Sequence, residues 1–553
     1  MTSVPTSTNT RWTKKRDAKR DRLSRISSMI DGKFVQQDNI VSVLERVIEP
    51  YDRVILEGNN QKQASFLSKS LANASNEALH HLHLIMSSVS RPEHLDLFEN
   101  EIADRLDFSF SGPQSTRIAQ MIEDEEIKVG NIHTYIELYG RLFIDLIPNV
   151  ALVAADQADA NGNLYTGANT EETPTIVEAT AFKNGIVIAQ VNEIVDELPR
   201  VDIPSSWVDV IVLGDEPYQL EALFTRDPRH ITEIQILMAM LAIRGVYEKH
   251  SVQSLNHGIG FNTAAIELLL PTYGESLNLR GKICKHWAAN PHPTLIPAIE
   301  SGWIDSIHSF GGEKGMEQYI AARPDVFFVG SDGTMRSNRT LCQMAGQYAV
   351  DLFIGSTLQM DYVGNSSTVV RGRLAGFGGA PNMGHDPKGR RHSTKAWLDM
   401  QKTGDELVRG RKLVVQMMET HQPGNRPVFV EQLDAIQVAK EANLGTPPVM
   451  IYADDVTHLV TEEGVAYLYK SDSPAERKEA IAAVAGVTEL GMTSTARQKH
   501  RLREQGIIAT TDDLEIDVKK ANRSLLAAKS IEELVMWSDN LYDPPEKFRS
   551  YWT

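Results

Sequence analysis

A glycine-rich loop at residues 376–384, which reads G-F-G-G-A-P-N-M-G, has the residue types best suited to chemistry. Glycine has no Cβ, so such a turn lets backbone N–H groups approach a ligand closely. The N–H groups of Gly378, Gly379 and Ala380 are therefore candidate donors to a developing oxyanion. The side chain of Asn382 is a fourth candidate donor. The alternative is a plain tight turn.

Two arginines, Arg371 and Arg373, precede this loop. A guanidinium group binds a carboxylate bidentately, so both are candidate ligands for an anionic substrate. Residues two apart on a strand share one face. Either both arginines line a pocket, or both face solvent in surface ion pairs, and the sequence leaves the two alternatives open.

Two further glycine-marked turns lie near the starts of the two halves of the chain. Residues 58–63 lie between a predicted strand, 52–57, and a predicted helix, 64–71. A turn of this kind can bind an anion at the helix N-terminus, although an ordinary strand-to-helix loop is equally compatible. The second turn, His257–Gly260, follows a predicted strand and precedes a predicted helix at 262–270.

The elements that must position these loops alternate between buried strands and helices. Continuous apolar runs predict strands at 150–155, 186–191, 208–213, 304–308, 326–330 and 350–358, and an apolar helix at 340–349 follows a loop that contains Arg336 and Arg339. The alternation predicts an α/β fold of two tandem domains, each a mostly parallel sheet covered by helices. A length of 553 residues also requires more than one core.

We place three parts along the chain: a basic N-terminal extension at 1–38, a first α/β domain at 39–245, and a second α/β domain with a helical C-terminal tail at 246–553. A helical segment at 231–247 is expected to join the halves, and a polar loop is expected at 156–163.

Bulk composition restricts the classes of function. The formal net charge of −17 disfavours nucleic-acid binding. Cys284 and Cys342 are the two cysteines and give no disulfide framework or metal spacing, which suits a reducing cytosol. The longest apolar run, 236–243, is too short to span a membrane, and the N-terminus does not resemble a signal peptide. We expect a cytoplasmic protein that binds no metal, nucleic acid or membrane.

Two basic segments each allow two interpretations. Residues 11–25 and the run from Lys388 to Lys395 are rich in lysine and arginine. Each is either a solvated face or a docking surface for a partner, and residues 11–25 could also be a nucleic-acid arm. For the second run the partner would be acidic or would carry phosphate groups.

Several segments, taken in order, resemble the class I CoA-transferase superfamily. Each is a weak signal alone, but the order is specific; the segments are 154–163, 187–192, 349–367, 376–379 and 460–466. Within that superfamily the chain is identified as a member of the malonate decarboxylase α-subunit family, on residues 58–64 and 376–386 and on its basic start. The resemblance covers essentially the whole chain.

The resemblance implies a reaction, partners and a set of site residues. The implied reaction is acetyl-S-ACP + malonate → malonyl-S-ACP + acetate. The implied partners are an acyl carrier protein subunit and two carboxylase-type subunits, and the small-molecule substrate is the dicarboxylate malonate. No cofactor is expected to stay bound; the ligand is the carrier's phosphoribosyl-dephospho-CoA thioester arm. The implied contacts, besides the loop, are Gly258, Gly260 and Asn365 for substrate and Gly376, Asn59 and Asn60 for the CoA-like arm.

The chain departs from the superfamily at one position. Many CoA-transferases carry a catalytic Glu that forms an acyl-glutamyl anhydride, and Ala289 falls where that Glu would be. No carboxylate lies between Lys282 and Pro297 in the sequence. We therefore expect malonate itself to attack the thioester through a mixed anhydride, with Asn290 and His286 orienting it. His286 and His292 could instead be packed histidines, and Asn290 a turn residue.

The sequence is also compatible with other functions. A CoA-transferase or hydrolase that acts on free CoA, a citrate lyase α-type subunit, and a non-catalytic scaffold subunit are the alternatives. Loss of the Glu favours the scaffold, whereas the glycine-rich loop favours catalysis.

Overall fold

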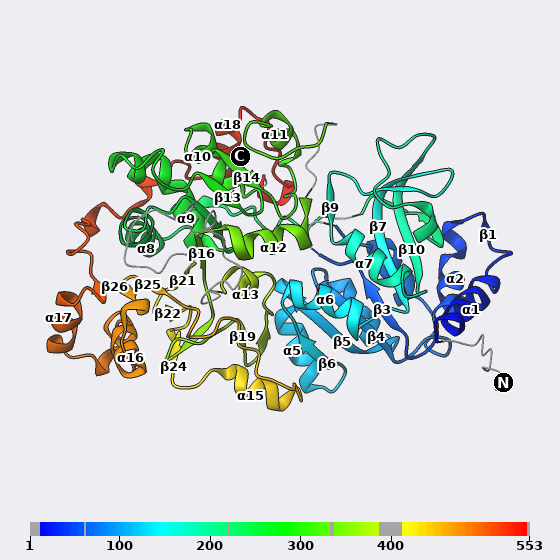
Figure 1. Ribbon diagram of the computed structural model, residues 1–553, viewed down its shortest axis with the longest axis horizontal. Helices are drawn as coiled ribbons and strands as arrows, with labels where there is room; N and C mark the ends of the chain where they lie inside the picture. Colours follow the sequence, from blue (N-terminus) through cyan, green and yellow to red (C-terminus); the bar gives the residue numbers. More distant parts are fainter. Residues whose placement is uncertain (1–10, 60–61, 219, 332–336, 386–411, 550–553) are drawn as a thin grey trace, which may run out of the picture.

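The computed structural model describes residues 11–59, 62–218, 220–331, 337–385 and 412–549. Two sheets, one in each half of the chain, organise it (Figure 1). Most strand pairs inside each sheet are parallel, and helices cover both, so the predicted α/β fold class is confirmed.

The first sheet has the strand order β1-β2-β11-β10-β7-β3-β4-β5-β6, with β8 paired to β7. Its strands are β1 (Ile30–Asp31), β2 (Phe34–Val35), β3 (Arg53–Leu56), β4 (Leu82–Ser88), β5 (Ala103–Phe110), β6 (Lys128–Ile132), β7 (Val150–Asp159), β8 (Leu164–Tyr165), β10 (Ile186–Val195) and β11 (Val210–Leu213). The central pair, β7 and β10, stays in parallel register as far as Asp159 and Val195. Strand β7 therefore occupies the first part of the loop predicted at 156–163, because ladder pairing continues through these polar residues.

Helices cover both faces of the first sheet. One face packs against α2 (Ile40–Val47), α3 (Ser65–Ala72), α4 (Asp96–Glu99) and α5 (Ser115–Glu123), and the other against α6 (Tyr135–Ile144) and α7 (Thr173–Ala181). Successive strand residues point to opposite faces: Val54 and Leu56 belong to the first core and Ile55 to the second.

The basic N-terminal helix α1 (Arg11–Ser24) is docked on the first half by ion pairs. Arg22 binds Asp52 at 2.5 Å and Glu49 at 2.6 Å, and Lys19 binds Asp209 at 2.8 Å. Strand β2 pairs with β11, so residues 30–35 belong to the first sheet although we assigned them to the N-terminal extension. Two-residue strands leave too little periodicity to be found in a sequence.

The second sheet has the strand order β14-β13-β12-β16-β21-β25-β26-β27. Its strands are β12 (Ser254–His257), β13 (His286–Ala288), β14 (Ser306–His308), β16 (Leu352–Gly355), β21 (Leu413–Met417), β25 (His458–Thr461), β26 (Gly464–Tyr467) and β27 (Ile508–Ala509). Residues 326–330, predicted as a strand, make one isolated bridge between Ile307 and Phe327.

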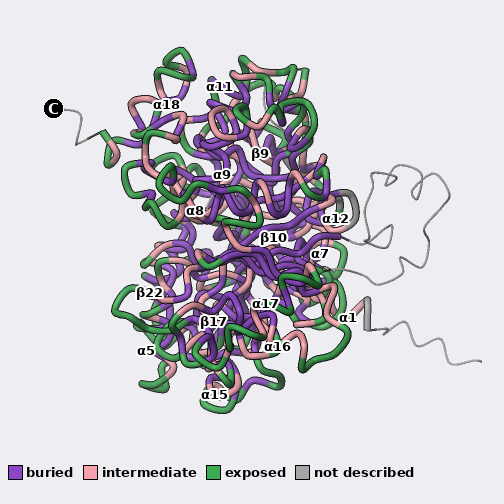
Figure 2. Tube along the Cα trace, turned by 90° about the vertical axis from the view of Figure 1, so that its left-hand side faces the viewer, coloured by how far each residue is buried: buried purple, intermediate pink, exposed green. Residues whose placement is uncertain are grey.

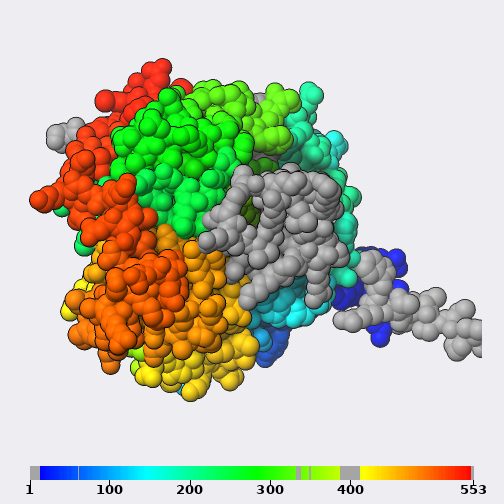
Figure 3. All heavy atoms as spheres, turned by 60° about the vertical axis from the view of Figure 1, so that its left-hand side comes forward, coloured from blue at the N-terminus to red at the C-terminus, as the bar shows by residue number. Residues whose placement is uncertain are grey.

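Most of the helices of the second half pack around this sheet: α8 (Glu233–Ala242), α9 (Phe261–Leu269), α10 (Ile296–Glu300), α11 (Glu317–Ala322), α12 (Arg339–Ala349), α13 (Ala380–Met383), α15 (Asp434–Glu441), α16 (Pro474–Ala483), α17 (Ala496–Glu504) and α18 (Ile531–Trp537). Helix α8, within the segment predicted to join the halves, contributes to the second core. Figure 3 shows the C-terminal residues, in orange and red, on the outside of the second half. No helix in the described part of the chain is long and apolar enough to cross a membrane.

Figure 2 shows buried residues concentrated in the interior of the molecule and exposed residues at its periphery. The two halves of the chain interlock. The hairpin of β19 (Val369–Val370) and β20 (Arg373–Leu374) inserts Val369 and Leu374 into the core of the first half. Two more short strands, β9 (Asn169–Glu171) and β15 (Ser337–Asn338), pair in parallel across the boundary. The remaining short strands are β17 (Gln359–Asp361), β18 (Ser366–Ser367), β22 (His421–Gln422), β23 (Arg426–Pro427) and β24 (Phe429–Val430).

Candidate active site

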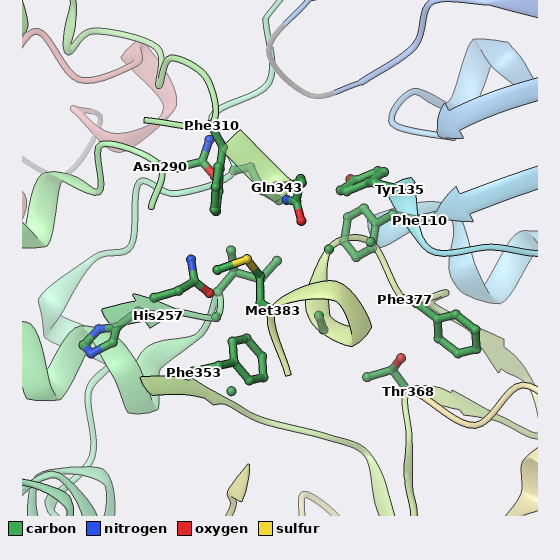
Figure 4. Close-up of a pocket in the computed structure, with 18 of the residues that line it drawn as sticks. Phe110, Tyr135, His257, Asn290, Phe310, Gln343, Phe353, Thr368, Phe377 and Met383 are labelled. Carbon is green, nitrogen blue, oxygen red and sulfur yellow. The ribbon is translucent and has the colours of Figure 1, made fainter. Parts of the chain in front are cut away.

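A cavity of about 180 Å³ lies between the halves. Figure 4 shows Phe110 and Tyr135 reaching it from the first half, with His257, Asn290 and Phe310 on the side of the second half. Much of the wall is apolar, with a few polar groups among the aromatic rings, which is typical of a small-molecule site. Ala375 and residues 376–380, the start of the glycine-rich loop, form one wall.

The glycine-rich loop is held by β5 of the first half. The carbonyl oxygen of Ser109 accepts the N–H of Phe377 at 2.7 Å and that of Gly378 at 2.9 Å. Gly376 has φ +74° and Gly378 has φ +57°, a region that other residues rarely adopt. A Cβ on Gly376 would lie 2.4 Å from the Ser109 carbonyl oxygen, so the close approach itself requires glycine.

The three residues predicted as backbone donors, Gly378, Gly379 and Ala380, line the cavity. Their N–H groups differ in whether they already have an acceptor. Gly378 donates to Ser109, and Ala380 donates to the Phe377 carbonyl at 3.3 Å. Within the described residues, the N–H of Gly379 has no acceptor. Gly379 therefore retains a backbone donor for a ligand.

Asn382 does not line this cavity, contrary to prediction. Its Oδ1 accepts the N–H of Ile136 at 3.3 Å, and its Nδ2 donates to Thr134 Oγ1 at 3.2 Å. Both polar atoms are used to join α13 to the start of α6. These partners lie almost 250 residues away, beyond the reach of local sequence reasoning.

The predicted malonate ligands Arg371 and Arg373 do not line the cavity either. Both are exposed on the β19–β20 hairpin, where the apolar residues turn inward. His286 is exposed at the start of β13 and its Nδ1 lies 2.9 Å from Ser306 Oγ. Asn365 donates to Asp361 Oδ2 at 2.7 Å within a turn and is likewise absent from the lining.

The other predicted residues divide between the cavity and its surroundings. Gly258, Asn290 and Gly376 line it. Gly260 precedes α9 outside the lining, and Asn59 is buried with its Oδ1 accepting the N–H of Lys62 at 3.0 Å. Asn60 and the basic run from Lys388 to Lys395 lie outside the described residues.

Asn290 follows β13, next to the position where the superfamily Glu was expected. Its side chain is buried, and its Nδ2 has no hydrogen-bond partner in the described part of the chain. Gln343 of α12 is also buried on the cavity wall, and its Oε1 is unpaired among the described residues. Unpaired buried amides are costly, so these groups are suited to a polar ligand.

Sequence reasoning missed Arg339 as a site residue. Its buried guanidinium lines the cavity 5.0 Å from the ring centroid of Tyr135. Both Nε and Nη2 lie 3.0 Å from Oε2 of Glu171, and Nη1 makes no hydrogen bond within the described residues. Burial alone would lower the pKa of Arg339, but the charge of Glu171 reverses this and raises it. The one sequence feature that could have indicated Arg339 as a site residue is its position directly before an apolar helix.

A buried polar network supports this pair from the first half. Glu57 lies 3.8 Å from Lys62 Nζ and accepts hydrogen bonds from Ala154 N–H and Thr173 Oγ1. Burial, only partly opposed by the charge of Lys62, raises the pKa of Glu57 to about 7. Glu172 accepts hydrogen bonds from Tyr139 at 2.9 Å and Ser87 at 2.7 Å. These carboxyl groups are bonded behind the cavity wall and do not line it.

A second buried cluster supports the wall on the side of the second half. His257 and His292 each place Nδ1 2.9 Å from Oε1 of Glu267, and Thr294 donates to Oε2. Burial alone would raise the pKa of Glu267, but the charge of His292 and the two histidine hydrogen bonds hold it well below its usual range. Both histidines are among the residues that line the cavity.

Comparison with known proteins assigns the chain to a family. The family model described as "Malonate decarboxylase, alpha subunit, transporter" matches residues 11–552. The chain belongs to the malonate decarboxylase α-subunit family.

Individual relatives of this α subunit support the same family assignment. An acetyl-S-ACP:malonate ACP transferase of Malonomonas rubra is 55% identical over 525 residues, which cover 94% of this chain and 95% of that protein. A Pseudomonas malonate decarboxylase hetero-tetramer, solved in complex with malonate, contains a chain 64% identical, with a TM-score of 0.94 over 98% of this chain and 100% of that one. The Acinetobacter baumannii malonate decarboxylase α subunit is 63% identical, with a TM-score of 0.92 over 97% of this chain and 100% of that one.

A more distant likeness concerns the fold alone. The putative citrate lyase α subunit of Streptococcus mutans is 15% identical and covers 82% of each chain, with a TM-score of 0.59.

The described part of the cavity wall of this α subunit carries no carboxylate. Among the described residues that line it, none is Asp or Glu. Ala289, where we expected the superfamily Glu to fall, is buried, and its N–H donates to the His308 carbonyl at 3.2 Å. The wall thus offers hydrogen-bond donors and a cation but no carboxylate nucleophile.

Proposed function

We propose that this α subunit transfers the carrier-protein thiol from an acetyl to a malonyl group: acetyl-S-ACP + malonate → malonyl-S-ACP + acetate. The observation that carries the proposal is the cavity between the halves, whose described lining residues combine Arg339 with the glycine-rich loop and include no carboxylate. The name of the Malonomonas rubra relative and the malonate bound by the Pseudomonas assembly support the same reaction.

Malonate is anchored by one carboxylate and reacts through the other. The Nη1 atom of Arg339 is available for the anchored carboxylate, and Nδ2 of Asn290 is a second donor. A guanidinium restrained by Glu171 loses little freedom on binding, which favours a fixed orientation of the attacking oxygen.

The chemistry then needs no enzyme nucleophile. A malonate oxygen attacks the acetyl carbonyl carbon, and the oxyanion that develops accepts the N–H of Gly379. The C–S bond breaks, which leaves an acetyl-malonyl mixed anhydride and the carrier thiol group. The sulfur attacks the malonyl carbonyl carbon, the bond between that carbon and the bridging oxygen breaks, and acetate leaves with the bridging oxygen.

The apolar wall has a role in this sequence. Phe110, Phe310 and Phe353 line the cavity beside the loop (Figure 4). A mixed anhydride hydrolyses readily in water, so a wall of aromatic rings protects it until the sulfur attacks.

The thioester reaches the cavity on the carrier's prosthetic arm. We propose that this arm is the phosphoribosyl-dephospho-CoA group, presented by an acyl carrier protein, and that carboxylase-type subunits decarboxylate the malonyl product. A reducing, cytoplasmic setting suits the free, buried thiols of Cys284 and Cys342.

An acceptor assay tests the proposal. The purified chain is incubated with acetyl-loaded carrier and malonate, citrate or acetate, and the carrier thioester is identified by mass spectrometry. We expect malonyl-carrier with malonate and no citryl-carrier, because Arg339 is the one Lys or Arg among the described residues that line the cavity, and a tricarboxylate needs more cations. Turnover with citrate would indicate a citrate lyase-type subunit, turnover with free CoA thioesters alone a CoA-transferase, and none at all a scaffold.

A further inference from the structure

The proposed reaction also needs a group that protonates the departing sulfur. When the acetyl C–S bond breaks, the departing sulfur carries a negative charge. An alkyl thiol has a pKa of about 8.5 in cysteine, so near neutral pH a thiolate leaves more slowly than a thiol that is protonated as it departs. A proton carrier on the cavity wall would meet this need.

His292 has the geometry of such a carrier. Its Nδ1 lies 2.9 Å from Glu267 Oε1, and its ring stacks on Phe224 at 5.2 Å between centroids. Because a carboxylate accepts the Nδ1 proton, Nε2 is the nitrogen left to exchange a proton with a ligand. Among the described residues, Nε2 of His292 has no hydrogen-bond partner, and the residue lines the cavity.

His257 shares the same carboxylate but differs at Nε2. Its Nδ1 also lies 2.9 Å from Glu267 Oε1, while its Nε2 is 2.8 Å from the hydroxyl of Tyr247. The second nitrogen of His257 is therefore already occupied. The two histidines can therefore be compared directly. They share the carboxylate of Glu267, but only His292 has an Nε2 without a hydrogen-bond partner in the described part of the chain.

Three charged side chains lie around His292. Glu267 is in direct contact, whereas Arg226 and Glu313 lie behind Phe224: Arg226 donates to the Phe224 carbonyl at 2.9 Å, and Glu313 accepts the Phe224 N–H at 3.1 Å. Glu267 is the anion bonded to the ring, and it stabilises an imidazolium as a buried carboxylate does in a Ser-His-Asp triad.

We propose that His292 carries the proton of the carrier thiol, and that Glu267 positions and charges the His292 ring. This inference rests on the proposed function. As the acetyl C–S bond breaks, its electron pair goes to sulfur, and the Nε2–H of the imidazolium protonates that sulfur. In the second step Nε2 takes the proton back as sulfur attacks the malonyl carbonyl, and acetate departs as the carboxylate. The enzyme ends each cycle in its starting protonation state.

The acidity of the leaving thiol tests this proposal. The full chain is assayed with malonate and two acetyl thioesters: one of N-acetylcysteamine, an ordinary alkyl thiol, and one of trifluoroethanethiol, which is far more acidic and needs no proton to leave. His292→Gln is expected to lower kcat/KM for the first thioester by about 100-fold or more, the usual contribution of general acid–base catalysis, and by less than about tenfold for the second.

Retained activity on the acidic thioester also shows that the variant is folded. An equal loss on both thioesters would overturn the assignment of His292. His257→Gln perturbs the same carboxylate and is expected to keep the wild-type ratio between the thioesters, even where its absolute rates fall. If the wild-type chain makes no malonyl thioester from loaded carrier, the proposed function itself fails, and this outcome is distinct from a failure of the proton carrier.

Glu267 is tested through the pH profile. Glu267→Gln removes the charge that favours the imidazolium, so the pH above which kcat for the N-acetylcysteamine thioester declines should move downward. A variant with reduced activity but an unmoved profile would assign Glu267 a merely structural role and contradict its part in the proposal.

Discussion

Both Nε and Nη2 of Arg339 lie 3.0 Å from Oε2 of Glu171, residues 168 apart in the chain and on opposite halves of the molecule. The pairing of β15 with β9 sets this contact, because Asn338 and Glu171 are register partners and Arg339 follows directly. The cation on the cavity wall is therefore assembled only when the halves pack together.

Arg339 should determine the affinity for malonate. Arg339→Lys keeps a positive charge but loses the forked geometry and the stacking on Tyr135. A hydrogen bond to a charged group contributes about 1.5–3 kcal/mol, so KM for malonate should rise about 10- to 100-fold. Steady-state kinetics with acetyl-loaded carrier measures it, and Arg373→Ala, an exposed arginine, is the matched control. An unchanged KM in Arg339→Lys would remove Arg339 from the substrate site.

The close approach of the glycine-rich loop to Ser109 should matter for catalysis. Gly376→Ala and Gly372→Ala place a Cβ at similar positive φ values, +74° and +70°, but only the first meets an atom, the Ser109 carbonyl oxygen at 2.4 Å. Both should lose about 1 kcal/mol of stability from left-handed strain. Only Gly376→Ala should lower kcat, by about 100-fold, because the displaced loop misdirects an oxyanion donor.

Chemical denaturation and kcat, measured on both variants, separate these effects. If Gly372→Ala lowers kcat as strongly as Gly376→Ala, the effect is general strain and not the position of the loop.

Glu57 should make stability depend on pH. Its pKa is raised by burial from 4.5 to about 7, so it favours folding below its unfolded pKa and loses that contribution as the pH rises through about 7. The free energy of unfolding of the wild type, relative to Glu57→Gln, should therefore fall by about 3 kcal/mol between pH 4.5 and pH 8. Urea titrations of both proteins at several pH values measure the difference. A difference that is constant with pH, or that grows as the pH rises, would contradict the shifted pKa.

Much of the fold and part of the site could be predicted from the sequence because their signals are local. Continuous apolar runs predicted where β7 and β10 begin. The glycines at 376, 378 and 379 predicted the loop that lines the cavity. Asn290, predicted as a site residue, also lines the cavity.

The rest depended on contacts distant in sequence. Arg371 and Arg373 are as cationic as Arg339, and no local pattern shows that the hairpin turns them outward. Asn382 has the right chemistry for an oxyanion donor, yet Thr134 and Ile136 of the other half already use both its polar atoms. The role of His292 becomes visible only once Glu267, on α9, is placed beside it.

Oxygen transfer in a single turnover tests the central claim, direct attack by malonate, most directly. The chain, in excess over acetyl-loaded carrier, is mixed with malonate labelled with ¹⁸O in both carboxylates, and the acetate released is analysed by mass spectrometry. Direct attack predicts one ¹⁸O atom in that acetate, because the oxygen that bridges the mixed anhydride comes from malonate. Unlabelled acetate in the first turnover would mean that an enzyme carboxylate or water supplied the oxygen, and would contradict the account.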